Sequence, residues 1–246
     1  MKIFLASTNC LCYENDFLKN MALSNKLYIL ESFYYISPFI TSLIPYFSDF
    51  LLDSGAFTFM NNKKDLNYNE YLERLISYIN ENNIKKFFEL DIDSLIGYEK
   101  VLELRKILEK ETNKKCIPVF HKSRGLKEWE RMCEEYDYVA IGTIGEYFKN
   151  FSILHKLLNI AKKNKTKVHG LGFTQLSKLH SFDFYSVDST SWKCGNRYGF
   201  IFKFTGKGLI QIGKQKGQRL IAKKALLHNF SEWVKYQKYV RINTGE

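Results

Sequence analysis

The sequence predicts an α/β fold, a (β/α)8 TIM barrel with a short basic C-terminal extension. Short runs rich in β-branched and aromatic residues alternate with amphipathic helical stretches, eight such runs occur, and the chain has 246 residues. This alternation is typical of βα units around a parallel sheet, and the length suits a single barrel. A doubly wound open sheet shares most of the pattern, so periodicity alone does not separate the two architectures.

The expected strands are apolar runs that end in polar residues or glycine. They cover residues 2–8, 26–33, 47–55, 87–93, 116–121, 136–143, 166–173 and 182–190. The clearest expected helix is 67–83, where apolar residues recur at helical spacing behind an Asn67 cap, and 97–112 and 125–135 have the same spacing. Another helix is expected over about 218–239, after a Gly- and Lys-rich break.

Positive charge is concentrated at the C-terminal end. Residues 205–246 carry nine Lys/Arg and two Asp/Glu, in a chain whose formal net charge is +11. A clustered positive surface favours a polyanion, because each neutralised phosphate releases condensed counterions. A lysine-rich solvated surface encoded by an AT-rich genome is the alternative. We divide the chain into a barrel domain, 1–204, and a basic strand/helix appendage packed on it, 205–246.

Composition excludes several classes of protein. With 45% hydrophobic residues and three prolines, the chain is typical of a folded domain. No stretch reaches the roughly 18 apolar residues of a membrane span, and residues 1–6 run into polar residues before a signal-peptide core forms, so we expect a cytoplasmic protein without a membrane partner. The cysteines fit reduced thiols better than disulfides, and no metal site is expected: Cys10, Cys12, Cys116, Cys133 and Cys194.

Polar residues and glycines recur at the C-terminal ends of the expected strands. They are Asp53, Asp91, Asp93, His121, the 142–146 segment, Gly170, Gly172 and Asp188. In a barrel these ends face one rim, where catalytic groups are carried. A single aspartate after a strand more often caps the next helix, but several such positions in register favour a site.

Two carboxylates facing each other across a pocket are what chemistry at an anomeric carbon requires. One attacks or stabilises the sugar carbon, and the other moves the proton of the departing or arriving group. Asp53 and Asp188 are the candidates, because both end expected strands and can point into a shared mouth. Phe57 is a candidate stacking face for a base, with core packing as the alternative.

Five motifs, in this order, resemble those of tRNA-guanine transglycosylases. They are DSGAF at 53–57, LDI at 90–92, AIGTIGE at 140–146, HGLG at 169–172 and VDSTSWKCGNRYG at 187–199. The resemblance covers roughly residues 47–204. The chain lacks that family's C-terminal zinc motif and is shorter than the tRNA enzymes. It is therefore most similar to the compact phage and bacterial branch that inserts 7-deazaguanines into DNA.

The resemblance implies a role for each matched residue. Asp188 would be the nucleophile that forms a covalent ribosyl intermediate, and Asp53 the general acid/base. The base would be bound by Phe57, Asp91, His121, Gly142, Thr143, Gly170, Leu171 and Gly172. His121 stands where the family commonly has Gln, and Ser189, Thr190 and Ser191 stand where a Pro-Thr-Arg usually follows the nucleophile.

The expected activity is therefore pentosyl transfer. Guanine in DNA is exchanged for a free 7-deazaguanine base as co-substrate, with no cofactor, and in the host cytoplasm if a phage encodes the protein. The phosphate backbone would be bound by Lys193, Arg197, Lys207, Lys214, Lys216, Arg219, Lys223 and Lys224 while the base is flipped out. The alternatives are tRNA as substrate, a nucleosidase or glycoside hydrolase that uses the same two acids, and a non-catalytic nucleic-acid-binding barrel.

Overall fold

A curled parallel sheet of seven strands forms the centre of the protein. The computed structural model describes residues 1–61, 67–142, 145, 147, 151–173, 176–214 and 221–245, apart from the side chains of residues 15, 176, 177, 196 and 197. The strands are β1 (Lys2–Ala6), β2 (Tyr28–Ser32), β3 (Asp49–Asp53), β4 (Val119–Phe120), β5 (Tyr138–Ile141), β6 (Lys167–Gly170) and β7 (Ser186–Ser189). Their spatial order is β3-β2-β1-β7-β6-β5-β4, so the chain begins in the middle of the sheet.

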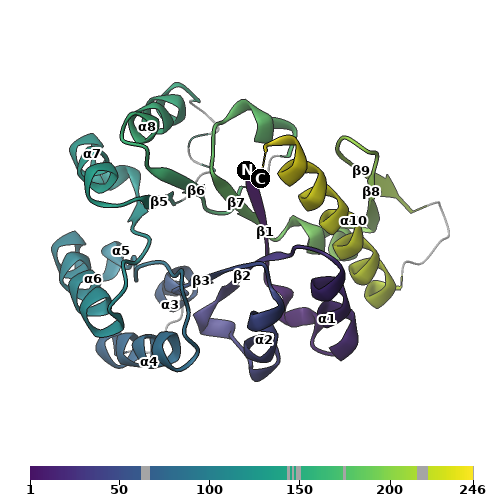
Figure 1. The fold of residues 1–246 in the computed structure, drawn as a ribbon, viewed down its shortest axis with the longest axis horizontal. Helices are drawn as coiled ribbons and strands as arrows, with labels where there is room; N and C mark the ends of the chain where they lie inside the picture. Colours follow the sequence, from purple (N-terminus) through teal and green to yellow (C-terminus); the bar gives the residue numbers. More distant parts are fainter. Residues whose placement is uncertain are drawn as a thin grey trace.

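The predicted fold class was wrong, because the sheet is not a closed eight-stranded TIM barrel. Seven strands form a curled α/β sheet (Figure 1). The expected strand 87–93 makes only isolated parallel bridges, from Phe87 to Leu52 of β3 and from Phe88 to Ile117 just before β4. The segment lies between the two edge strands without forming a strand of its own.

A buried carboxylate explains why this segment does not continue as a strand. The side chain of Glu89 accepts the backbone N–H of Val119 at 2.7 Å, a position that a backbone carbonyl fills in a regular ladder. The N–H of Ile92 then bonds the carbonyl of Leu90 at 3.0 Å and turns the chain into a short helix. The sequence pattern predicts a strand from the apolar run, but it does not show that the Glu89 side chain takes the place of a backbone carbonyl.

Most helices lie around the outside of the curled sheet (Figure 1). They are α1 (Asn15–Ser24), α2 (Pro38–Leu43), α3 (Ala56–Asn61), α4 (Tyr68–Glu81), α5 (Asp93–Ile96), α6 (Tyr98–Thr112), α7 (Leu126–Glu135), α8 (Phe151–Lys163), α9 (Cys194–Tyr198) and α10 (Ala222–Asn243). The helices expected at 67–83, 97–112 and 125–135 are confirmed as α4, α6 and α7. The predicted cap is present, since Asn67 Oδ1 accepts the N–H groups of Asn69 and Glu70 at 3.0 and 3.4 Å.

The C-terminal segment forms a hairpin and a long helix. Strand β8 (Phe200–Phe204) pairs antiparallel with β9 (Leu209–Gly213), and the domain division expected at 204/205 falls at the turn between them. Helix α10 lies against β8 and β1 (Figure 1). Its Gln237 Nε2 donates to the carbonyls of Ile3 and Tyr28 at 2.7 and 3.0 Å, so the helix is bound directly to the central sheet.

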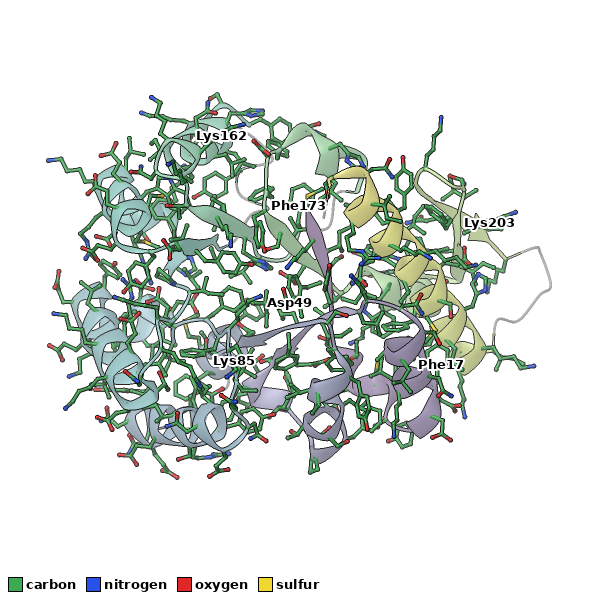
Figure 2. The ribbon with its side chains drawn as sticks, in the orientation of Figure 1. Phe17, Asp49, Lys85, Lys162, Phe173 and Lys203 are labelled. Carbon is green, nitrogen blue, oxygen red and sulfur yellow. The ribbon has the colours of Figure 1, made fainter. Side chains whose placement is uncertain are left out.

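The inside of the curl is filled by apolar side chains. The cluster there comprises Phe4, Ala6, Tyr28, Leu30, Leu51, Phe88, Ile117, Val119 and Ala140. The charged side chains of Lys162 and Lys203 lie at the periphery, whereas Asp49 lies toward the middle (Figure 2). In the described part of the chain, no helix has both the length and the apolar character that a membrane crossing requires.

Candidate active site

Asp53 and Asp188 lie on the same face of the curled sheet, at the carboxyl ends of β3 and β7. Side chains alternate between the two faces along a strand, so Asp53 shares the face of Leu51. Asp188 pairs in register with Phe4 of β1, and Leu51 and Phe4 belong to the same interior cluster. The two acids therefore lie next to the region beyond the carboxyl ends of the strands, where proteins with parallel sheets bind their ligands.

The electrostatics of Asp53 indicate that three acids meet there. Burial, and after it the charges of Asp91 and Asp188, raise the pKa of the Asp53 carboxyl to about 7, against hydrogen bonds from Gly55 and Ser32 that lower it. Gly55 donates its N–H to Asp53 Oδ2 at 3.2 Å, with φ at +80°. A Cβ at Gly55 would lie 2.7 Å from Tyr71 Oη, so the tight turn after β3 requires glycine.

Asp188 lies beside a backbone N–H donor and a histidine ring nitrogen. Its side chain is buried, and Oδ1 accepts the N–H of Gly172 at 2.7 Å and lies 3.3 Å from Nε2 of His169. Gly172 turns its N–H toward the acid from a left-handed conformation, with φ at +68°. The sequence reasoning selected Gly172 as a base contact and missed His169. The sequence does contain an indication of His169, because a histidine stands inside the expected strand 166–173. Side chains alternate between the two faces of a strand, and that of His169 falls on the interior face.

A pocket of about 930 Å³ gathers three of the predicted base-binding residues. Phe57, Asp91 and His121 line it together with residues of α5 and the start of α6. Phe57 lies on α3 with 77% of its surface exposed, so its ring is not part of the core. A cavity of this size, with an exposed aromatic ring and several polar side chains around it, can hold a planar heterocycle that carries hydrogen-bonding groups.

Asp91 and His121 form the polar wall of this pocket. Their Oδ2 and Nε2 atoms are 2.7 Å apart. Burial raises the pKa of Asp91, while the hydrogen bond from His121 lowers it. Burial lowers the pKa of His121, but the hydrogen bond and charge of Asp91 outweigh it and the pKa is raised. A Cβ on Gly142 would lie 2.6 Å from Cε1 of His121, so this glycine makes room for the imidazole.

An ion-pair cluster adjoins this wall, and two of its members, Asp93 and Arg124, also line the pocket. Arg124, with 1% of its side chain exposed, bonds Asp93 through two nitrogens at 2.7 and 2.9 Å and bonds Glu89 at 2.8 Å. Its guanidinium lies 4.2 Å from the centroid of the Tyr98 ring, and Arg105 bonds the other oxygen of Glu89 at 2.7 Å. Sequence reasoning named Asp93 but missed both arginines, because nothing local pairs them with acids more than ten residues away.

The remaining candidate residues lie at the end of β6, in the turn after β7, and on the C-terminal hairpin and helix, or outside the described residues. Gly170 ends β6 and Leu171 packs on the interior cluster, while Thr143 lies outside the described residues. Lys193 is half-buried in the turn after β7, and Lys207, Lys214 and Lys224 are exposed on the hairpin and α10. Lys223 pairs with Glu14. Lys216, Arg219 and the side chain of Arg197 lie outside the description.

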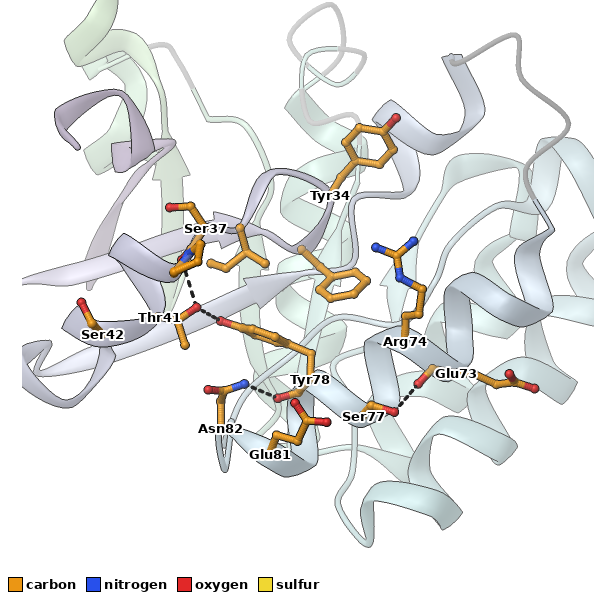
Figure 3. Close-up of a pocket in the computed structure, with 13 residues that line it drawn as sticks. Tyr34, Ser37, Thr41, Ser42, Glu73, Arg74, Ser77, Tyr78, Glu81 and Asn82 are labelled. Carbon is orange, nitrogen blue, oxygen red and sulfur yellow. Dashed lines mark hydrogen bonds between the residues drawn. The ribbon is translucent and has the colours of Figure 1, made fainter. Parts of the chain in front are cut away.

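Another cavity lies between α2 and α4, on the flank of the molecule (Figure 3). It measures about 870 Å³, and the hydroxyls of Tyr78 and Thr41 are 2.8 Å apart in it. Neither Asp53 nor Asp188 lines it. Neither acid lines the pocket beside Asp91 either, but that pocket is linked to them, because Asp91 lines it and the charge of Asp91 raises the pKa of Asp53.

The described residues include no cluster of three or more His, Cys, Asp or Glu side chains that could hold a metal ion. No protein-family model matches this chain, and a search of curated proteins gives no match.

Proposed function

We propose that the protein is a base-exchange transglycosylase that replaces guanine in DNA with a 7-deazaguanine. The observation that carries this is the pairing of two different carboxyl groups on one face. Asp188 is fixed by two N–H donors, and Asp53 has a pKa near neutrality because it is buried beside Asp91 and Asp188. Two carboxyl groups whose environments set different roles are what glycosyl transfer uses.

In the first half-reaction an oxygen of Asp188 attacks C1′ of the sugar. The C1′–N9 bond breaks, its electron pair goes to N9 of guanine, and protonated Asp53 supplies the proton. The products are a glycosyl ester on Asp188, ionised Asp53 and free guanine. A pKa of about 7 leaves a large share of Asp53 protonated for this step at neutral pH.

The second half-reaction reverses these transfers with a new base. Ionised Asp53 takes the N9 proton of the incoming 7-deazaguanine, N9 attacks C1′, and the ester oxygen returns to Asp188 as a carboxylate. Two displacements at C1′ give net retention. The same Asp53 therefore serves as acid and then as base.

The pocket supplies the contacts that a flipped base needs. Flipping costs a few kcal/mol of unstacking, and stacking on an aromatic ring contributes about 1–3 kcal/mol per base. Phe57 offers such a ring. Asp91 Oδ2 is engaged by His121, while Oδ1 has no hydrogen-bond partner in the described part of the chain and is available for the N–H donors of a guanine edge.

The test is incorporation of labelled guanine or 7-deazaguanine into duplex DNA and into tRNA. We expect incorporation into DNA by the wild-type protein and by Asp183→Asn, whose acid is exposed and remote from the strand ends. Asp188→Asn should lower the rate by about 10³-fold or more while keeping DNA affinity. Release of base without incorporation would instead indicate a hydrolase, and incorporation into tRNA alone would change the substrate. Exchange by Asp188→Asn would remove its role as nucleophile.

A further inference from the structure

We infer that His169 is a positioning residue that fixes the Asp188 carboxylate by Oδ1 and leaves Oδ2 as the oxygen that attacks the sugar. The inference rests on the proposed function for the identity of the nucleophile. It adds a residue outside the set that the motifs predict, and it assigns different roles to the two carboxylate oxygens.

The hydrogen bonds of Asp188 are unequally distributed between its two oxygens. Oδ1 has Gly172 N at 2.7 Å and His169 Nε2 at 3.3 Å. Within the described ranges, Oδ2 has no hydrogen-bond partner. A carboxylate oxygen that accepts two N–H bonds has its lone pairs engaged, so the oxygen without donors is the better nucleophile. Anchoring one oxygen also fixes the direction in which the other points.

The bonds of the imidazole determine which nitrogen carries its proton. Nδ1 lies 2.7 Å from the hydroxyl of Ser186 and 3.4 Å from Oη of Tyr138, and these two hydroxyls are 2.5 Å apart. A carboxylate only accepts, so Nε2 must hold the proton that it donates to Asp188. Nδ1 then accepts from Ser186, and Ser186 accepts from Tyr138.

Each group in this buried chain therefore donates a hydrogen bond to the next: Tyr138 to Ser186, Ser186 to His169, and His169 to Asp188. Burial raises the pKa of Tyr138, which keeps its hydroxyl protonated at the start of the chain. Ser186 and His169 are both fully buried. A fixed tautomer, set by the bond at the far nitrogen, is how a histidine keeps a neighbouring group oriented.

Aromatic rings fix the orientation of His169. Its ring centroid is 5.3 Å from that of Phe88 and 6.0 Å from that of Phe4, in tilted and edge contacts. A histidine in such apolar surroundings is costly unless both nitrogens are bonded. Both are bonded here, and the bond at Nε2 ends on the proposed nucleophile.

The tautomer is tested first, by ¹⁵N NMR of histidine-labelled wild-type protein, with the His169 signal assigned by its loss in His169→Gln. We expect a neutral ring protonated at Nε2, and a change in the Nε2 resonance in Asp188→Asn. A ring protonated at Nδ1, or at both nitrogens, would overturn the inference. This measurement needs no activity.

Kinetics then separate positioning from packing. Gln offers an N–H donor near the place of Nε2, whereas Leu has a similar volume and no donor. We expect His169→Leu to lower kcat by about 10- to 100-fold with KM unchanged, because Asp188 loses the donor that fixes the direction of its free oxygen. His169→Gln should stay within a few-fold of wild type, as should His180→Gln, which changes an exposed histidine.

The outcomes distinguish the two proposals. Equal losses in His169→Gln and His169→Leu would overturn the role of His169 while the wild-type protein still exchanges bases. An inactive wild-type protein would remove the proposed function and this role together. Thermal unfolding of each variant shows whether a loss of kcat comes from loss of folded protein.

Discussion

Asp53 combines two causes that raise its pKa, burial and the neighbouring acids. The resulting pKa of about 7 lets the carboxyl be protonated in one half-reaction and ionised in the next without leaving the neutral range. A general acid/base is most effective when its pKa is close to the working pH. Removal of either neighbouring charge would lower the pKa and favour the base over the acid.

The two half-reactions should therefore respond to pH in opposite directions. Ester formation requires protonated Asp53, so its single-turnover rate should fall as the pH rises through about 7. Capture of the incoming base requires ionised Asp53, so its rate should rise with pH, and over a lower range, because esterified Asp188 no longer carries the charge that raises the pKa of Asp53. Asp53→Asn should lose both dependences, and Asp183→Asn should keep them. Parallel pH profiles for the two half-reactions would assign the proton transfer to another group.

Gly142 gives a residue-scale test of the base pocket. Gly142→Ala places a Cβ 2.6 Å from Cε1 and 2.9 Å from Nδ1 of His121, so the ring must move away from Asp91. We expect binding of free base, measured by calorimetry, to weaken by about 1–3 kcal/mol from the disturbed hydrogen bond. Gly208→Ala meets no atom within 4 Å and should bind like wild type. Equal affinity in the two variants would place the base away from His121.

The site residues that the sequence predicts are those that stand in short motifs directly after an apolar run. Asp53, Phe57 and Asp91 follow apolar strands in short motifs, and the structure places Phe57 and Asp91 on one pocket. His169 and Arg124 were missed because their importance depends on partners in other elements, Asp188 for one and Glu89 and Asp93 for the other. A motif read along the chain does not reveal which buried polar groups meet across it.

At the scale of elements, side chains replace backbone ladder bonds at two places in the sheet. Glu89 takes the N–H of Val119, and Gln237 of α10 bonds the carbonyls of Ile3 and Tyr28, near where direct pairing of β1 and β2 begins. These bonds join segments distant in sequence. Helices such as α4 were predictable, because their caps and apolar stripes lie within one segment, whereas the end of the 87–93 run was not.

Gln237 should contribute measurably to stability. Gln237→Leu removes its donor to both carbonyls and its bond with the N–H of Tyr28 while keeping a similar volume, so we expect the free energy of unfolding in urea to fall by about 1–3 kcal/mol. Gln211→Leu, on the exposed strand β9, is the matched control and should change it by less than about 0.5 kcal/mol. Equal stability of the two variants would mean that α10 is held by apolar packing alone.

At the scale of the whole molecule, the parallel α/β character was predictable but the closure of the sheet was not. Alternating apolar runs and helices require a parallel sheet, and β1 lies between β2 and β7. Whether the edges β3 and β4 close depends on a few backbone groups of residues 87 and 88, which make isolated bridges. The pattern of strands in the sequence does not distinguish a closed barrel from an open curled sheet when so few backbone groups decide between them. The closed barrel and the curled sheet both bring Asp53 and Asp188 to the same end of the sheet.

The basic C-terminal segment leads to a prediction about the molecule as a polyelectrolyte. Lys207, Lys214 and Lys224 are exposed, so replacing all three with Gln should weaken DNA binding and reduce the slope of log Kd against log salt by up to about 0.9 per lysine. The matched control replaces three exposed lysines that lie outside the basic C-terminal segment, Lys85, Lys106 and Lys110, and should leave the slope unchanged.

Within the C-terminal segment, Lys223→Gln should have a smaller effect than Lys224→Gln, because Lys223 is already paired with Glu14. Equal slopes for the two triple variants would place the phosphates elsewhere, with the half-buried Lys193 beside β7 as the next candidate.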